Sequence, residues 1–144
     1  MKIVLLKDRP DLLNSAKEVV LKYSKYDYIT EDNLNYLLLD NDDVIIGEID
    51  YSLPLGSVDL LYIYIKEEYR GRGLSKYLLN ESIEDLQKKD VKEIFLEVSK
   101  INIIALNLYN KMGFQKISER KNYYEGNIDA IIMKKTIGWK ICIF

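Results

Sequence analysis

The pattern of apolar and polar positions along the chain predicts a protein in which strands and helices alternate. Apolar runs rich in Val, Ile, Leu and Tyr predict strands, and apolar residues spaced three and four apart predict helices. The predicted strands lie at 2–6, 35–39, 44–53, 58–65, 93–98, 114–124 and 128–135, and the predicted helices at about 12–23, 74–86 and 101–112. This order predicts a mixed, mostly antiparallel sheet flanked by helices, in a single domain spanning residues 1–144.

Short polar residues mark where the predicted elements begin and end. Asp8, Pro10 and Asp11 form a capping-box-like start for the first helix. Gly113 follows the last predicted helix, where a C-terminal capping glycine is expected. Ile101, Ile104, Ala105, Leu108 and Met112 are spaced to form the buried face of that helix.

The stretch EEYRGRGLSKYLL (67–79) places two glycines between the strongest predicted strand and an amphipathic helix. Glycine there lets the backbone approach an anion closely, and the free N–H groups of a helix start attract negative charge. The spacing fits neither a Walker loop nor the dinucleotide-binding fingerprint. By itself the stretch is slightly more typical of an ordinary turn with solvated arginines.

Arg70-Gly71-Arg72-Gly73-Leu74-Ser75 resembles the pyrophosphate loop of the GNAT acetyltransferase superfamily, with Ser75 where the family usually has glycine or alanine. A second landmark, LEVSKINIIALNLYNKMGF (96–114), resembles the same family. RKNYY (120–124) followed by DAIIM (129–133) resembles more narrowly the ribosomal-protein-alanine N-acetyltransferases. The resemblance covers residues 60–134 and implies a GNAT fold, with acetyl-CoA as cosubstrate held at a splayed strand pair.

The resemblance also implies which residues bind the cosubstrate. Residues of the strand before the glycine turn would pair with the pantetheine arm, and the turn itself would hold the pyrophosphate. The implied residues are Ile63, Tyr64, Ile65, Arg70, Gly71, Arg72, Gly73, Leu74, Ser75, Lys76 and Asn102. Asn102 is equally well explained as a helix N-cap.

Two residues are implied to carry the chemistry. Glu97 interrupts the apolar run 94–98, so we expect its carboxylate to be partly desolvated, and the resemblance makes it the general base. Without the resemblance, a strand-edge glutamate paired with a lysine is the ordinary interpretation. Tyr109 lies at the edge of an apolar helix face, and the resemblance makes it the proton donor to the departing thiolate. A core aromatic is the ordinary alternative.

The acceptor is expected to be a primary amine, most specifically the N-terminal α-amine of a ribosomal or other protein. Tyr123 and Tyr124 are predicted to contact it, although aromatic pairs of a surface hairpin would give the same pattern. A small amine or a lysine side chain is the alternative acceptor. A non-catalytic module that binds coenzyme A is the alternative function.

Composition narrows these possibilities. The 144 residues include 21 Lys and Arg, 23 Asp and Glu and no histidine, so acid–base chemistry falls to other residues and no histidine metal site is expected. The balanced charge predicts no nucleic-acid partner. The absence of a long apolar run predicts no membrane span and a cytoplasmic protein. The single cysteine, Cys142, lies in the apolar tail 136–144 without a base to activate it, so we expect direct acetyl transfer in a ternary complex.

Overall fold

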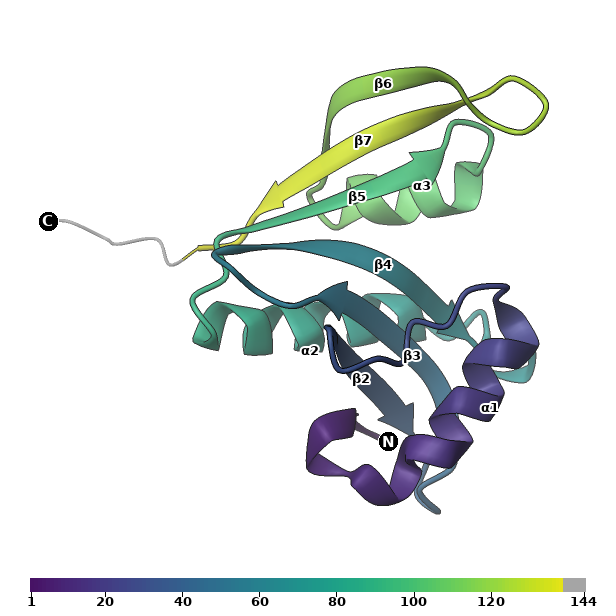
Figure 1. Cartoon of the computed structure of the whole chain (residues 1–144), viewed down its shortest axis with the longest axis vertical. Coiled ribbons are helices and arrows are strands. Elements are labelled where there is room, and N and C mark those ends of the chain that lie inside the picture. The colour runs from purple at the N-terminus through teal and green to yellow at the C-terminus, as the bar shows by residue number, and fades with distance from the viewer. Residues whose placement is uncertain (139–144) are drawn as a thin grey trace, which may run out of the picture. The chain divides into compact units, whose positions relative to one another are not determined.

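The computed structural model describes residues 1–138, and its elements follow one another as strands and helices (Figure 1). The strands are β1 (Lys2–Leu5), β2 (Asn33–Leu39), β3 (Ile45–Ser52), β4 (Ser57–Ile65), β5 (Glu93–Ser99), β6 (Gln115–Tyr124) and β7 (Ile128–Thr136). The α-helices are α1 (Leu13–Tyr23), α2 (Leu74–Lys88) and α3 (Ile103–Lys111). Three 3-10 turns lie at Leu6–Asp8, Pro10–Leu12 and Glu67–Tyr69.

The strands are hydrogen bonded in the order β1-β2-β3-β4-β5-β7-β6. All neighbours are antiparallel except β4 and β5, which are parallel and joined through α2. Pairing of β4 with β5 runs from Ser57–Glu93 to Asp59–Phe95. The predicted fold class, a mixed and mostly antiparallel sheet flanked by helices, is therefore confirmed.

The chain forms two compact units. Unit 1 contains residues 1–53 and 60–85, and the described part of unit 2 contains residues 54–59 and 86–138. In unit 1 the sheet β1–β4 has a helix on each face. On one face, Leu37 of β2 belongs to the same buried cluster as Ala16 and Val20 of α1. On the other face, Tyr51 hydrogen bonds to Ser82 of α2 at 2.8 Å. Alternation along each strand therefore gives unit 1 two cores.

Unit 2 contains β5, β7 and β6 together with α3 and the first residues of β4. Along β5 the residues Ile94, Leu96 and Val98 are buried, as period-2 alternation requires. Tyr109 of α3 packs edge-on against Phe114, with ring centroids 5.6 Å apart. Gly113 ends the helix with φ of 86°, so the predicted capping glycine is confirmed.

Two local predictions were wrong. Helix α1 has no side-chain cap at its start, because it begins later than predicted and its N-cap is Leu12, whose side chain has no acceptor. Asp8 ends a 3-10 turn, and Asp11 forms an ion pair with Arg9 at 2.9 Å. The predicted buried face of α3 is covered only in part, since Ile101 is 67% exposed and Ile104 87% exposed. Tyr109, predicted at the edge of that face, is buried.

The predictions for Cys142 and for most of the tail 136–144 concern residues outside the described part of the chain. Within residues 1–138, no helix is long and apolar enough to cross a membrane.

Candidate functional site

The glycine turn before α2 has the geometry of an anion cradle. Gly71 and Gly73 have φ of 79° and 74°, in the left-handed region that residues with a Cβ avoid. A Cβ built on either glycine would meet nothing within 4 Å, so the space in front of the turn is open. The first N–H of this region with a backbone acceptor is that of Tyr77, which donates to the Gly73 carbonyl at 3.1 Å.

The amides of residues 71–76 make no hydrogen bond to any group within residues 1–138. The start of a helix leaves such N–H groups unpaired, and the helix dipole adds partial positive charge at the same end. The residues present therefore fit a phosphate group. The sequence placed Gly71, Gly73, Leu74, Ser75 and Lys76 in this turn and helix start, and the structure brings them together.

The side chains of the two arginines in the turn contact residues that lie just before it in the chain. The Nε of Arg70 donates to the Ile65 carbonyl at 2.8 Å, which ties the turn to the end of β4. Arg72 lies over the ring of Tyr69, at 5.3 Å from its centroid. Both arginines belong to the turn that carries the unpaired amides, and each adds a positive charge to it. The other predicted cosubstrate residues of unit 1, Ile63 and Tyr64, lie on β4 opposite Ile49 and Glu48 of β3.

Glu97 lies on β5 in unit 2, opposite Ile132 of β7. It is more exposed than the sequence suggested, with 36% of its side chain accessible and an ion pair to Arg120 at 3.2 Å. The expectation of partial desolvation was wrong because Leu96 and Val98 point to the opposite face of the strand. The apolar run therefore says nothing about the surroundings of the residue between them. Its partner is an arginine of β6, not the lysine of the ordinary alternative.

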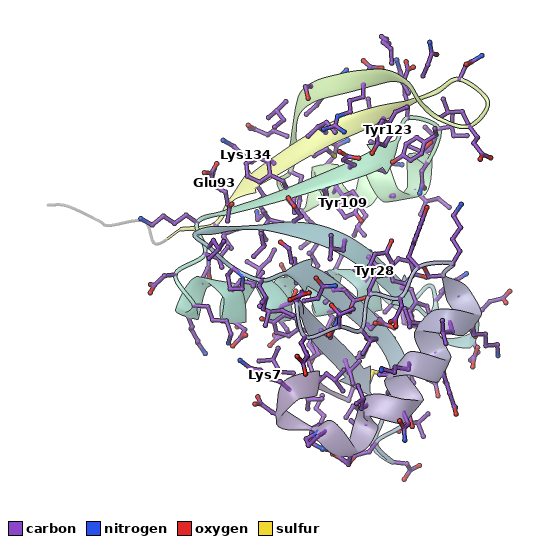
Figure 2. The ribbon with its side chains drawn as sticks, viewed as in Figure 1. Lys7, Tyr28, Glu93, Tyr109, Tyr123 and Lys134 are labelled. Atoms are coloured by element: carbon purple, nitrogen blue, oxygen red, sulfur yellow. The ribbon has the colours of Figure 1, made fainter. Side chains whose placement is uncertain are left out.

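Tyr109 lies in the last part of α3 and is 6% exposed. Burial raises the pKa of its phenol to about 12, so the hydroxyl keeps its proton at neutral pH. Figure 2 labels this side chain in unit 2. A protonated phenol held in a fixed position can donate a proton to a leaving group.

Asn102 is the N-cap of α3, since its Oδ1 accepts the N–H of Ala105 at 3.1 Å. The helix-capping interpretation is therefore confirmed, and it uses the Oδ1 atom of the Asn102 side-chain amide. A role in binding cosubstrate stays a prediction for its NH₂ group.

Tyr123 and Tyr124 close β6, where a bulge between Arg120 and Tyr124 interrupts the pairing with β7. Their rings pack edge to face at 5.1 Å, and Arg120 lies 5.2 Å from the centre of the Tyr123 ring. Burial, then the charge of Glu97, raises the pKa of Tyr124. Arg120 thus contacts both Glu97 and Tyr123, which brings one predicted catalytic residue and the two predicted acceptor residues into one group on unit 2.

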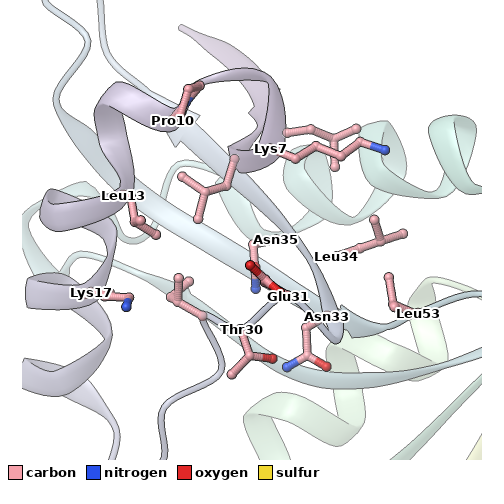
Figure 3. Close-up of a pocket in the computed structure, with 13 residues that line it drawn as sticks. Lys7, Pro10, Leu13, Lys17, Thr30, Glu31, Asn33, Leu34, Asn35 and Leu53 are labelled. Carbon is pink, nitrogen blue, oxygen red and sulfur yellow. The ribbon is translucent and has the colours of Figure 1, made fainter.

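Unit 1 also contains a cavity of about 470 Å³ that the sequence did not predict (Figure 3). Lys7, Lys17, Glu31 and Asn35 are among its lining residues, and most of the lining is apolar. None of the predicted site residues lines it.

Two acidic residues of β3, Glu48 and Asp50, are fully buried on the face of unit 1 that carries α1, and sequence reasoning missed them. The available signal was the run IIGEIDYSL, in which two acids stand two apart in an apolar strand. Among residues 1–138, no group of three or more His, Cys, Asp or Glu is placed to hold a metal ion.

Comparison with known families gives one match. Residues 6–114 match the model of the acetyltransferase (GNAT) family. This range contains the glycine turn, Glu97, Asn102 and Tyr109, and it runs through both units.

One sequence comparison and two structural comparisons illustrate the similarity. A protein of Escherichia coli (strain K12) named ribosomal protein bS18-alanine N-acetyltransferase is 35% identical over 103 residues, 69% of each chain. The crystal structure of the Escherichia coli ribosomal-protein-S18-alanine N-acetyltransferase superposes with a TM-score of 0.81 at 26% identity, covering 99% of this chain and 98% of that one. Arabidopsis thaliana NAA60 in complex with acetyl-CoA superposes with a TM-score of 0.75 at 19% identity, covering 94% and 99%, which shows a shared fold.

Proposed function

Because the chain belongs to the GNAT acetyltransferase family, we propose that it transfers the acetyl group of acetyl-CoA to the N-terminal α-amine of a protein. The observation that carries the choice of acceptor is the 35% identity, over 69% of each chain, to the Escherichia coli enzyme whose name gives ribosomal protein bS18 and alanine as its target. We propose the same class of acceptor here, a protein that begins with a small residue.

Acetyl-CoA is the proposed cosubstrate, and its pyrophosphate would be held by the amides of residues 71–76. The open space over Gly71 and Gly73 and the unpaired amides support this assignment. Ile63, Tyr64 and Ile65 would bind the pantetheine arm through their backbone, and Asn102 would contact it through its NH₂ group. Bound acetyl-CoA supplies the thioester whose acetyl carbon is attacked by the amine.

Glu97 is the proposed general base. Its carboxylate is solvent-accessible and forms an ion pair with Arg120. It also lies close enough to Tyr124 for its charge to raise the pKa of that phenol. It would take the proton of the α-ammonium, directly or through a water. The α-amine of a peptide has a pKa of about 7.7–8.0 against about 10.4 for lysine, so a carboxylate suffices for the first acceptor more readily than for the second.

Tyr109 is the proposed proton donor. As the carbon–sulfur bond breaks, the departing thiolate would receive the phenolic proton, which the burial of Tyr109 keeps in place at neutral pH. The first amine proton thus goes to Glu97 and from there to solvent. The second leaves the nitrogen as the amide forms and replaces the proton that Tyr109 gives to the thiolate, so the net products are the amide, the thiol and one H⁺.

We propose that the two units act as one catalytic domain in the cytoplasm. The family match supports the first part because it begins in unit 1 and ends in unit 2. The ribosomal targets in the names of the relatives support the second.

The acceptor is tested with a panel of peptides at equal concentration. We expect peptides with a free N-terminal alanine to be acetylated faster than N-terminally blocked peptides that offer only a lysine amine. Tyr123→Ala and Tyr124→Ala should raise the peptide KM, while the matched control Ile117→Ala on the same strand, 51% exposed, should not. Faster acetylation of blocked lysine peptides or of polyamines would contradict the N-terminal acceptor.

The cosubstrate is tested separately by calorimetry with acetyl-CoA. Gly73→Glu places a carboxylate and a strained φ in the proposed cradle, so binding should be lost. Gly56→Glu is the control, because Gly56 also has a positive φ, of 90°, and open space around it. Equal affinities for the wild type and Gly73→Glu would refute the cradle.

A further inference from the structure

One face of the unit 1 sheet contains two acids without a cation. Glu48 and Asp50 are adjacent inward positions of β3, and each is 0% exposed. Among residues 1–138, no lysine or arginine forms an ion pair with either carboxyl group. Buried acidic side chains normally have a partner, because removing a charge from water is costly. The pair therefore needs a physical explanation.

Four buried oxygen atoms of this face have no hydrogen-bond partner in the described structure: both carboxylate oxygens of Glu48, Oδ2 of Asp50 and the hydroxyl of Tyr64. Tyr64 lies directly opposite Glu48 in the register of β3 and β4, and it is 6% exposed. Asp50 has one partner, Asn35, whose Nδ2 donates to its Oδ1 at 2.7 Å. Glu48, Asp50 and Tyr64 share this face in the register of β3 and β4, and the charge of Glu48 raises the pKa of Tyr64 after burial. Unpaired buried oxygens that share a face call for a ligand with several N–H or O–H donors.

Tyrosine rings enclose the same acids. Tyr62 is opposite Asp50 on β4, and its ring stacks on Tyr28 at 5.1 Å between centroids. Tyr64 stacks on Tyr23, the last residue of α1, at 4.7 Å. The hydroxyl of Tyr62 donates to the Tyr23 carbonyl at 3.0 Å, which joins the two stacks. Figure 2 labels Tyr28 in unit 1. Aromatic faces around carboxylates favour an organic cation.

Without a ligand, the two acids must share a proton. Burial raises the pKa of both, and the negative neighbour raises that of Glu48 further. The other charged or titratable groups that act on this face are Asp27, Glu68, Arg70 and the tyrosines. A protonated Glu48 that donates to Asp50 would satisfy one oxygen of each and leave the remaining acceptors free.

We propose that this face of unit 1, between β3, β4 and the end of α1, is a binding site for an alkylammonium group. An R–NH₃⁺ group has three N–H donors and one charge, which match the unpaired oxygens of Glu48, Asp50 and Tyr64. Binding releases the shared proton, so R–NH₃⁺ and the protonated pair give the complex and one H⁺. Two carboxylates with aromatic walls do not supply the six to eight oxygen ligands that Ca²⁺ requires.

The neighbouring cavity is not this site, although Asn35 lines it (Figure 3). Lys7 and Lys17 are among its lining residues, and their charges disfavour a cation. Entry to the acids is instead controlled by Tyr28 and Tyr62, whose stacked rings are only half-buried. Tyr28 belongs to the segment between α1 and β2, which is anchored where Asn33 and Asn35 donate to the Tyr28 carbonyl. The stacked pair must open for the ammonium group to enter.

The site is tested by calorimetry on the full chain without acetyl-CoA, so the result does not depend on acetyl transfer. We expect n-butylammonium to bind saturably and to release about one proton, measured from the heats in phosphate and in HEPES, neither of which is a primary amine, at one pH. Tetramethylammonium, which has no N–H donor, should bind much more weakly. Glu48→Gln should weaken n-butylammonium binding at least about tenfold, because a charge-assisted hydrogen bond is lost.

Asp85→Asn is the matched control, since Asp85 is a part-buried acid of unit 1 that accepts from Tyr36 on the opposite face of the sheet. Its affinity should equal that of the wild type. Tyr64→Phe removes one acceptor oxygen and should weaken binding several-fold, which keeps the test valid if Glu48→Gln fails to fold. Absence of saturable binding would overturn the proposal. So would n-butylammonium affinities of Glu48→Gln and Tyr64→Phe that both equal the affinity of the wild type.

The same measurement separates two sources of the ammonium group. Spermidine represents a free polyamine, and N-acetyl-lysine methylamide represents a lysine of a protein. Both contain the proposed group, and the tighter binder identifies the source. If neither binds while n-butylammonium does, neither source fits past the Tyr28–Tyr62 pair, and the assignment to biological amines is refuted.

Discussion

The acidic side chains of the two units differ in burial and in their cationic partners. In unit 1, Glu48 and Asp50 are fully buried and have no cationic partner in the described residues. In unit 2, Glu119 and Asp129 lie at the surface among lysines. Lys100, Lys116 and Lys121 all lie within 3.4 Å of Glu119. Burial raises the pKa of the first two acids, whereas hydrogen bonds from lysines lower the pKa of Glu119.

This difference bears directly on function. A base must be unprotonated at neutral pH and accessible to its substrate, and only the unit 2 arrangement offers both. Glu97 resembles the unit 2 acids in its surroundings, because it is accessible and forms an ion pair with a guanidinium group. Glu48, in contrast, is suited to receive a cation and not to abstract a proton in an open site.

The largest expected effect is on turnover in unit 2. Glu97→Gln should lower kcat by about 10²–10⁴-fold with little change in the Kd for acetyl-CoA, because a general base is lost. Glu93→Gln is the matched control: Glu93 lies on the same strand, is 38% exposed and pairs with Lys134 at 2.9 Å (Figure 2). Steady-state kinetics with an alanine peptide measure both variants. Equal losses would show that the ion pairs matter only for structure.

A smaller loss of turnover is expected for Tyr109→Phe. Removing the phenolic hydroxyl takes away the proposed proton donor but leaves the ring against Phe114. We expect kcat to fall by about 10²-fold, at the lower end of general-acid effects, while the melting temperature changes little. Melting that falls together with kcat would assign Tyr109 to packing alone.

The contrast between the units also predicts opposite pH dependences of stability. Glu48 and Asp50 have pKa values above those of the unfolded chain, so the folded state binds more protons and stability falls as pH rises above the unfolded values, near 4. The slope is at most about 1.4 kcal/mol per pH unit for each proton. Glu48→Gln should flatten this decline between pH 5 and 9 in urea titrations. An unchanged slope would show that the pair is not protonated.

The next effect concerns the close approach of β3 and β4 that buries these acids. A Cβ on Gly47 would lie 2.8 Å from the Tyr64 carbonyl oxygen, a backbone atom that cannot move aside. Gly47→Ala should therefore destabilise by about 1–3 kcal/mol. Gly138→Ala in unit 2 is the control, because its nearest neighbour is the flexible Lys92 side chain at 3.3 Å. Urea unfolding compares them, and equal losses would mean that the strands can separate.

The sequence predicted most of the fold because its strands and helices carry strong local periodicity. Strand β4 and helix α2 were predicted within a few residues, together with the glycine turn between them. The beginning of α1 was mispredicted, because the Asp11 carboxylate could accept hydrogen bonds either from the helix backbone or from a nearby cation, and it pairs with Arg9. Local sequence cannot decide between a cap and an ion pair.

The site was predicted in part for a similar reason. The family resemblance makes Glu97 and Tyr109 the candidate catalytic residues, and their roles stay predictions, but the ion pair of Glu97 with Arg120 depends on the register of β5, β7 and β6. The acids of unit 1 were missed because the alternation of acids with apolar residues in β3 is typical of a strand with one solvent-exposed face, whereas β3 is buried on both faces. Their cover of tyrosines comes from α1, from the segment after it and from β4, which only tertiary structure brings together.

The smallest expected effect concerns the surface acids of unit 2. Hydrogen bonds from Lys100 and Lys116 lower the pKa of Glu119 to about 2. Its contribution to stability is thus complete above the unfolded value, near 4.5, and is lost as pH falls toward 2. Glu119→Gln should lower the melting temperature slightly at pH 7 and not at pH 2, and 1 M salt should screen most of the difference. A difference that persists at pH 2 or in high salt would show that Glu119 stabilises unit 2 by packing, and the electrostatic contrast between the units would then rest on Glu48 and Asp50 alone.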